Sequence, residues 1–235
     1  MRKIVLMLSV SLDGFFEGPN HELDWQLVDD ELHGHFNEVL GAMGAFLNGR
    51  VTYELMAGFW PTADADPAST EPMIEFARIW RDMPKICYST TLDHAEWNTT
   101  VVRDVVPAEV VELKAQPGGD LAVGGADLAA TFMRFDLIDE CRLYVHPVLI
   151  GGGKRLFEPS DVKVDLRLAE TRAFGNGVVL LRYQRAHGEE RDRAEPETTA
   201  FLVASSLGFI AVVVSAAILW QRAGRRATPS PSPSE

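Results

Sequence analysis

The sequence predicts an α/β domain in which helices flank a mainly parallel sheet with a C-terminal antiparallel hairpin, followed by one C-terminal transmembrane helix. Three observations predict this fold class. Apolar runs of strand length alternate with segments of helical periodicity over residues 2–185. Two β-rich runs near the end of that region flank the turn residues Gly175, Asn176 and Gly177. Beyond them, residues 200–220 carry no charged side chain.

The first half of the domain is expected to begin with a strand at 3–10, because these residues form a continuous apolar run. A helix is expected at 29–40, where Leu32, Phe36 and Leu40 recur at helical spacing. The next expected elements are a buried strand at 42–48, helices at 51–58 and 71–81, and a strand at 84–89 that opens on Pro84.

The second half continues this alternation. A short strand is expected at 99–102, and a helix at 107–114, where Pro107 suits the first turn. Strands separated by helices favour parallel pairing, whereas two consecutive β-rich runs favour an antiparallel hairpin. The remaining expected elements are a strand at 121–123, a helix at 126–135, and β-rich runs at 140–150, 162–173 and 178–185.

Composition divides the chain into four parts. Residues 1–186 form the predicted domain, and the charged segment 187–199 has no apolar face, which is typical of a solvated linker. The 21 uncharged residues of 200–220 would span about 31 Å as a helix, which matches a bilayer core. Residues 221–235 have the composition of a disordered Pro/Ser-rich tail. The alternative for 200–220 is a helix or strand of the domain core.

A C-terminal membrane helix predicts a single-pass anchor. The chain starts without a secretory signal, because the apolar stretch from Ile4 meets Asp13 and Gly14 too early. This favours a membrane-anchored protein with the domain in the cytoplasm. The basic residues of the tail, Arg222, Arg225 and Arg226, favour the opposite orientation.

The bulk composition excludes some classes of function. A net charge of −12 and a pI of about 4.9 argue against nucleic-acid binding. Cys87 and Cys141 lie in apolar runs and are expected to be reduced thiols of the core. The six histidines show no metal-ligand spacing, so no metal site is predicted.

Three turns that follow expected strands carry residues suited to bind an anion. Paired glycines before a helix let the backbone approach a ligand, and the first helix N–H groups point at it. Because ligands of open α/β sheets bind at the carboxyl ends of strands, the turns together suit a dinucleotide with an additional phosphate. Each turn alone is equally consistent with ordinary turn chemistry. The residues are Gly124 and Gly125; Gly49, Arg50 and Thr52; and Ser89, Thr90 and Thr91.

Four motifs occur in order along the domain: SLDG at 11–14, GRVTYE at 49–54, GG at 124–125 and PVLIGGG at 147–153. In this order they resemble the dihydrofolate reductase superfamily, and more specifically the reductase domain of riboflavin biosynthesis. The resemblance covers residues 2–185 and implies an NADPH cofactor. It implies that the cofactor phosphates contact Gly49, Arg50 and Thr52, the 2′-phosphate lies near Ser89, Thr90 and Thr91, and the pyrophosphate lies at Gly124 and Gly125.

The resemblance also implies two candidate catalytic carboxylates. Asp13 of the SLDG motif lies where the first strand meets the expected pocket. Asp30 lies five positions after Trp25, the place of an acidic residue that orients and helps protonate the substrate in dihydrofolate reductases. Asp-Gly also occurs in ordinary turns, and the acidic residues 29–31 also suit the dipole of a helix N-terminus.

The expected activity is hydride transfer from NADPH to a C=N or C=O carbon of a small heterocyclic substrate. Under the resemblance, the first candidate substrate is 5-amino-6-(5-phosphoribosylamino)uracil, the second is dihydrofolate, and the third is another compound taken by the same fold. A ribose phosphate requires basic side chains, which Lys154 and Arg155 could supply. The alternative is a membrane-tethered module that binds a nucleotide without turnover.

Two further expectations follow from the resemblance. The sequence contains neither H-x-E nor P-C-x-x-C, the motifs of the zinc deaminase that often accompanies such a reductase. Any deamination is therefore expected from another protein. The family also pairs its late strands between subunits, so a homodimer is expected.

Overall fold

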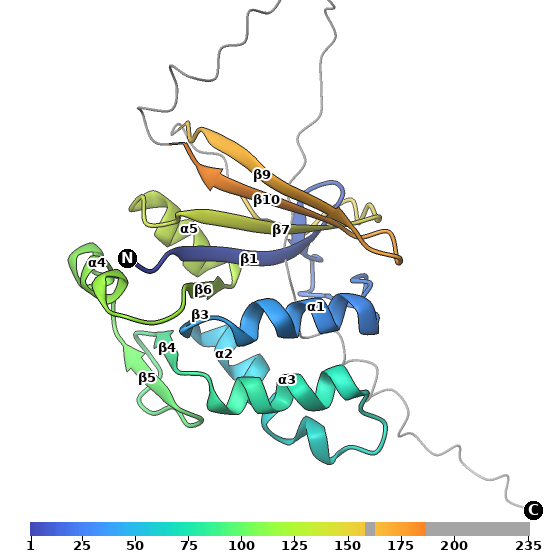
Figure 1. The fold of residues 1–235 in the computed structure, drawn as a ribbon, viewed down its shortest axis with the longest axis horizontal. Coiled ribbons are helices and arrows are strands. Elements are labelled where there is room, and N and C mark those ends of the chain that lie inside the picture. Colours follow the sequence, from blue (N-terminus) through green and yellow to red (C-terminus); the bar gives the residue numbers. More distant parts are fainter. Residues whose placement is uncertain (158–162, 187–235) are drawn as a thin grey trace, which may run out of the picture.

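The computed structural model describes residues 1–157 and 163–186. The strands of its main sheet are β1 (Ile4–Ser11), β3 (Ala45–Gly49), β4 (Lys85–Tyr88), β5 (Thr99–Val102), β6 (Leu121–Gly124), β7 (Glu140–His146), β9 (Leu166–Ala173) and β10 (Val179–Arg185). They lie in the order β5-β4-β3-β6-β1-β7-β10-β9 (Figure 1). All neighbours pair in parallel except β10, which runs antiparallel to both β7 and β9. The predicted α/β sheet with its C-terminal hairpin is confirmed.

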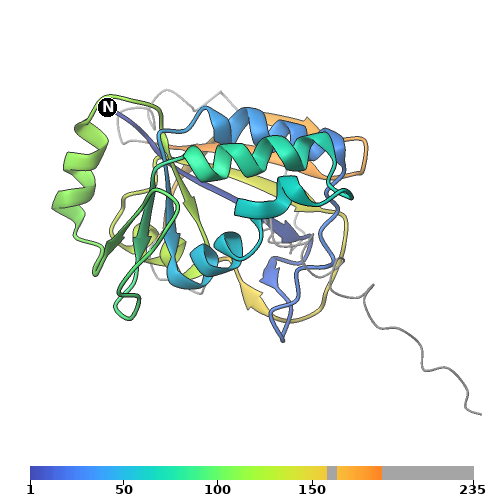
Figure 2. The same cartoon turned by 90° about the horizontal axis from the view of Figure 1, so that it is seen from below.

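Helices cover both faces of this sheet. They are α1 (Asp30–Gly41), α2 (Arg50–Ala57), the 3-10 helix η1 (Trp60–Ala65), α3 (Glu71–Asp82), α4 (Pro107–Ala115) and α5 (Ala126–Arg134). On one face, Val5 of β1 shares a core with Trp80 of α3, and α1 lies beside α3 (Figure 2). On the other face, Leu6 packs in the core that contains Phe132 of α5. The central strands are thus buried from both sides.

Burial follows the position of each strand in the sheet. All eight residues of β1 are buried, which explains why it appears in the sequence as an unbroken apolar run. All eight residues of β9, at the edge, are exposed. A second, two-stranded sheet pairs β2 (Phe15–Glu17) with β8 (Lys154–Arg155). It brings the glycine-rich segment 151–153 close to the end of β1.

The prediction of a membrane helix needs correction. In residues 1–157 and 163–186, no helix is long and apolar enough to cross a membrane. The longest, α1 and α3, have 12 residues each, or about 18 Å at helical rise, against about 30 Å of bilayer core. The transmembrane helix in the predicted fold and the membrane localisation based on it are therefore wrong for the described chain. The predicted linker 187–199, helix 200–220 and tail 221–235 lie outside the described residues.

Candidate functional site

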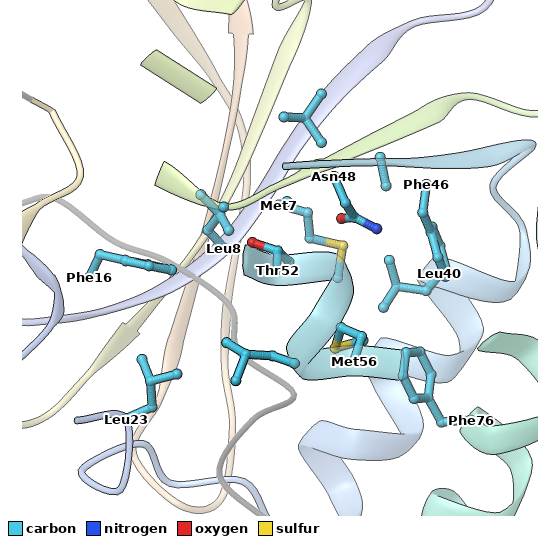
Figure 3. A pocket seen from close by; sticks show the side chains of 15 residues that line it. Met7, Leu8, Phe16, Leu23, Leu40, Phe46, Asn48, Thr52, Met56 and Phe76 are labelled. Carbon is cyan, nitrogen blue, oxygen red and sulfur yellow. The ribbon is translucent and has the colours of Figure 1, made fainter. Parts of the chain in front are cut away.

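An apolar pocket lies beside the middle of β1 and along β3 and β6 to their carboxyl ends, against α1, α2 and α3 (Figure 3). Its volume is about 110 Å³, several times what a single water molecule needs. Two lining side chains are polar, Asn48 and Thr52. The apolar lining side chains include Met7, Leu8, Phe16, Leu23, Leu40, Phe46, Leu55, Met56 and Phe76. The pocket therefore suits a flat apolar ring with a few polar contacts along one side.

The turn from β3 to α2 forms the polar side of this pocket. Asn48 is buried near the end of β3, and α2 begins at the next residue but one. Gly49 is the N-cap of α2 and offers no side-chain acceptor to the first helical N–H groups. Thr52, one turn into the helix, lines the pocket. This helix start is consequently suited to bind an anion.

The glycine pair after β6 lies directly against this turn. Gly125 has φ of +90° and is the N-cap of α5, again without a side-chain acceptor. A Cβ atom on Gly125 would lie 2.5 Å from Oγ1 of Thr52, and one on Gly124 would lie 3.0 Å from Oδ1 of Asn48. Only glycine lets the two turns approach this closely. The predicted cofactor residues Thr52, Gly124 and Gly125 thus come together.

Arg50 lies just outside the pocket lining, on the first turn of α2. Its Nη1 donates to Oε2 of Glu54 at 2.7 Å, and its side chain is 44% exposed. An exposed pair of this kind is weak. A phosphate at the start of α2 could therefore replace Glu54 as the partner of the guanidinium.

The third predicted turn, after β4, is organised by its own serine. Ser89 is buried, and its Oγ accepts hydrogen bonds from the backbone N–H groups of Thr91 and Leu92 at 3.2 and 2.9 Å. Thr90 and Thr91 are exposed. The hydroxyls of these two threonines, and not that of Ser89, are therefore available to a ligand.

Arg103 is a basic residue at this turn that the sequence analysis missed. Its Nη1 donates to the carbonyl oxygens of Leu92 at 2.8 Å and Ser89 at 3.2 Å, and its Nη2 pairs with Asp93 at 3.1 Å. Arg103 directly follows β5, as Arg50 follows β3. The position after a strand, which singled out Arg50, could have identified it.

Asp13 fastens the glycine-rich segment to the turn between β1 and β2. Its two carboxylate oxygens accept hydrogen bonds from the backbone N–H groups of Ile150 at 3.2 Å and Gly151 at 2.7 Å. Partial burial raises the pKa of Asp13, but the hydrogen bonds from Ser11, Gly151 and Ile150 outweigh it and lower the pKa overall. Asp13 is therefore ionised and held in place.

The acidic first turn of α1 has a clear structural role. Asp29 is the N-cap, and its Oδ1 accepts from the backbone N–H of Leu32 at 2.9 Å. Glu31 accepts from the backbone N–H of Gly175 at 3.0 Å, which ties α1 to the turn between β9 and β10. Asp30 is exposed and does not line the pocket in the described chain.

The loop before α1 supplies one wall of the pocket through Leu23. His146, at the end of β7, holds this loop. Its Nδ1 accepts from the backbone N–H of Leu27 at 3.0 Å, and Trp25 packs edge-on against its ring. Burial lowers the pKa of His146 to about 4, so the ring is neutral near pH 7. The sequence analysis did not predict that Leu23, Phe16 and Asn48 line the pocket, because no local sequence pattern distinguishes a residue of a pocket wall from a residue of the core.

Comparison with known proteins decides the family. The model of the RibD C-terminal domain matches residues 2–180. The chain belongs to the RibD C-terminal domain family. The resemblance to riboflavin-type reductases of the dihydrofolate reductase superfamily is therefore confirmed.

This chain has relatives of similar sequence and of similar structure. The uncharacterized protein YyaP of Bacillus subtilis strain 168 is 35% identical over 183 residues, which cover 77% of this chain and 94% of YyaP. A protein of Shewanella sp. PV-4 assigned to riboflavin biosynthesis has a similar structure, with a TM-score of 0.61 and 21% identity over 80% of this chain and 100% of its own.

A third similar structure is the diaminohydroxyphosphoribosylaminopyrimidine deaminase/5-amino-6-(5-phosphoribosylamino)uracil reductase of Thermotoga maritima. Its TM-score is 0.54 at 13% identity, and the match covers 79% of this chain and 57% of that protein. At such low identity, the two structural similarities show the shared fold. The family membership makes this chain a reductase-like protein related to riboflavin biosynthesis.

Proposed function

We propose that this protein is an NADPH-dependent reductase that transfers a hydride to a small ring substrate. The observation that carries the proposal is the contact between two glycine turns, at Gly49 and at Gly124 and Gly125, beside an apolar pocket. Each turn opens a helix whose N-cap provides no side-chain acceptor. Two such helix starts side by side suit the two phosphates of a dinucleotide.

The residues present fit NADPH. Gly124 and Gly125 let the start of α5 approach Asn48 and Thr52 closely, and the space beside Gly49 is open, so the two helix starts present their N–H groups to one place. Gly49, Arg50 and Thr52 would bind phosphate oxygens from the start of α2, and Ser89, Thr90 and Thr91 would form the turn beside the 2′-phosphate. When bound, the cofactor supplies the hydride from its nicotinamide ring.

The remaining residues would orient the substrate and keep water away from it. The apolar side chains of β1, α1 and α2 form walls that exclude water from the ring-binding space. Asp13 would hold the glycine-rich segment against the turn between β1 and β2, which leads to the pocket residue Phe16, because its ionised carboxylate binds two backbone N–H groups of that segment. Asp30, exposed on the first turn of α1, would relay a proton to the substrate through solvent.

The test is a calorimetric titration of the full chain with NADPH and with NADH. We expect NADPH to bind more tightly. The Arg50→Ala variant should weaken binding of both nucleotides about tenfold, since one charge-assisted hydrogen bond to the phosphates that they share is lost. Oxidation of bound NADPH in the presence of ring carbonyl compounds then distinguishes a reductase from a module that binds the nucleotide without turnover.

Arg134→Ala provides the matched control, because Arg134 is exposed at the opposite end of α5 from the glycine pair. It should leave both affinities unchanged. Failure of the folded wild-type protein to bind either nucleotide would refute the proposed function.

We also propose that the protein forms a homodimer through β9. This strand ends the sheet, and all eight of its residues are exposed. Leu166 and Leu168 are 43% and 50% exposed. An edge strand this long and partly apolar favours pairing with another strand.

A further inference from the structure

Eleven of the 15 residues that line the pocket come from a stretch of chain almost without basic residues. Arg50 is the only Lys or Arg between Ile4 and Ala77, whereas residues 4–49 alone contain eight Asp and Glu. This stretch supplies β1, β2, α1, β3, α2 and the start of α3. The electrostatic potential on this side of the site is consequently negative or neutral.

The pocket lining agrees with the distribution of charge in the sequence. None of the 15 residues that line it in the described chain is charged (Figure 3). The histidines of α1 do not supply a positive charge either. Burial lowers the pKa of His33 to about 4, and burial together with the nearby Arg172 lowers the pKa of His35.

The two basic residues expected to receive a substrate phosphate lie outside the pocket lining and contact other side chains. Nζ of Lys154 donates to Oδ2 of Asp127 at 2.6 Å. The guanidinium of Arg155 lies over the ring of Phe15, 4.8 Å from its centroid. Neither residue lines the pocket. Arg50, the one Lys or Arg between Ile4 and Ala77, is assigned to the cofactor in the proposed function.

We propose that the substrate is an uncharged, planar ring compound with a conjugated carbonyl group, and that it carries no phosphate. The proposal rests on the proposed function. A phosphate placed among these walls would be buried without a counter-charge, which costs far more than an apolar ring gains there. In the reaction, the carbonyl carbon gains a hydride, the C=O π bond breaks, the oxygen takes a proton from water, and NADPH becomes NADP⁺.

A pair of probes that differ in one charged group tests this substrate class. The full chain is assayed for NADPH oxidation with isatin and with isatin-5-sulfonate, and for binding of both probes by calorimetry. We expect kcat/KM for isatin to exceed that for the sulfonate by more than about tenfold. The phosphoribosyl intermediate 5-amino-6-(5-phosphoribosylamino)uracil should show no turnover.

A lysine placed on the pocket wall provides the decisive variant. Leu55 lines the pocket and is 46% exposed, so Leu55→Lys adds a positive charge without burying it. It should reduce the preference for isatin by roughly three- to tenfold, mainly through a lower KM for the sulfonate. Val111→Lys is the control, because Val111 is 49% exposed on α4, away from the pocket, and should not change the preference.

Each outcome separates this inference from the proposed function. The proposal of an uncharged substrate would be overturned by any of three results: equal or better use of the sulfonate, turnover of the phosphoribosyl intermediate, or failure of isatin to bind or react. In each case, NADPH binding would still uphold the cofactor site. If the folded protein binds no NADPH, the proposed function is overturned. Calorimetry with isatin and its sulfonate would then still show whether the pocket prefers the uncharged or the charged probe.

Discussion

At the scale of single residues, the site depends on the absence of side chains as much as on their presence. Gly125 combines φ of +90° with the hydroxyl of Thr52 at 2.5 Å from its missing Cβ. Gly49 has φ of −75° and no atom within 4 Å of a Cβ position. Two glycines that look alike in the sequence therefore have different reasons to be there. Gly125 is required by the fold, whereas the space beside Gly49 is open and is where we propose that the cofactor binds.

This difference predicts opposite behaviour of two alanine variants. Gly125→Ala should lower the free energy of unfolding by about 1–3 kcal/mol, because alanine is strained at positive φ, and it should also weaken NADPH binding. Gly49→Ala should change the free energy of unfolding by only about 0.5 kcal/mol and still weaken NADPH binding. Urea unfolding and calorimetry of the full chain measure both. Unchanged NADPH affinity in Gly49→Ala would remove Gly49 from the cofactor site.

The sequence could predict that Thr52, Gly124 and Gly125 lie together, but it could not predict the partners of the other candidate residues. Strand-to-helix spacing brought Thr52, Gly124 and Gly125 to one edge of the sheet, because parallel strands share that edge. Spacing carries no information on whether a side chain already has a hydrogen-bond or ion-pair partner within the protein. Arg50 pairs with Glu54, and the hydroxyl of Ser89 is used by its own turn. Whether Arg50 and Ser89 can contact a ligand therefore depends on hydrogen bonds that are seen only in the folded chain.

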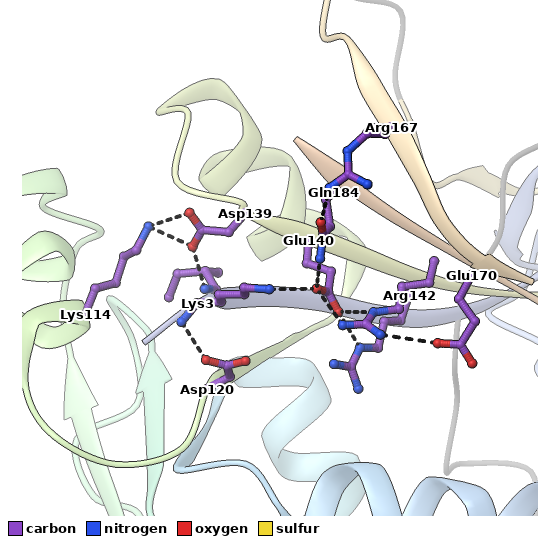
Figure 4. Close-up of polar contacts among 11 residues, drawn as sticks. Lys3, Lys114, Asp120, Asp139, Glu140, Arg142, Arg167, Glu170 and Gln184 are labelled. Carbon is purple, nitrogen blue, oxygen red and sulfur yellow. Dashed lines mark hydrogen bonds and ion pairs between the residues drawn. The ribbon is translucent and has the colours of Figure 1, made fainter. Parts of the chain in front are cut away.

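At the scale of elements, one buried carboxylate joins three strands at the end of the sheet opposite the pocket. Glu140 of β7 accepts from Lys3, next to β1, at 3.2 Å, from Arg142 at 2.8 Å and from Arg182 of β10 at 2.7 Å (Figure 4). Burial alone would raise the pKa of Glu140, but the hydrogen bonds from Arg182 and Arg142 lower it to about 2. The parallel sheet and its antiparallel hairpin are fastened at this point.

Glu140→Gln should therefore destabilise the fold by about 2–4 kcal/mol at neutral pH, because it leaves three cations around a neutral amide. The folded pKa of about 2 lies below the ordinary value of 4.5. The contribution of the carboxylate is thus complete above pH 4.5 and is lost as the pH falls toward 2. Urea unfolding between these pH values should show a smaller loss of stability in the variant than in the wild type.

Glu170→Gln is the matched control for this measurement. Glu170 pairs with the same Arg182 at 3.2 Å, but its side chain is 46% exposed. Its replacement should cost less than about 1 kcal/mol. Equal destabilisation by the two substitutions would show that burial of Glu140 does not determine how much its ion pairs contribute to the free energy of unfolding.

The sequence predicted the bounds of several elements to within one residue. The strand expected at 99–102 is Thr99–Val102, and the helix expected at 107–114 is Pro107–Ala115. The β-rich run expected at 140–150 stops at His146, because Pro147 follows and has no N–H for the ladder. β2 and β8 were missed because strands of three and two residues exist only through their pairing.

At the scale of the whole molecule, acidic and basic residues are separated. The pocket side comes from a stretch with a single basic residue, Arg50, whereas β7, β9 and β10 carry several arginines, such as Arg142, Arg172 and Arg182. The hairpin of β9 and β10 therefore differs in charge from the pocket side. It also contains the exposed edge of the sheet. The proposed ligand site and the proposed subunit contact thus lie on separate parts of this fold.

The exposed edge predicts the oligomeric state. Leu166 and Leu168 of β9 lie on the same face as the half-buried Leu181 and Tyr183 of β10, according to the strand register. A second copy of β9 in antiparallel pairing would satisfy the backbone groups of the edge and cover both leucines.

Analytical ultracentrifugation of the full chain should give a dimer. Leu168→Lys should raise its dissociation constant at least about tenfold, since a charge on the seam must be desolvated. Val111→Lys, on α4, should leave the dimer intact. A monomeric wild type, or equal weakening by both lysines, would refute pairing through β9.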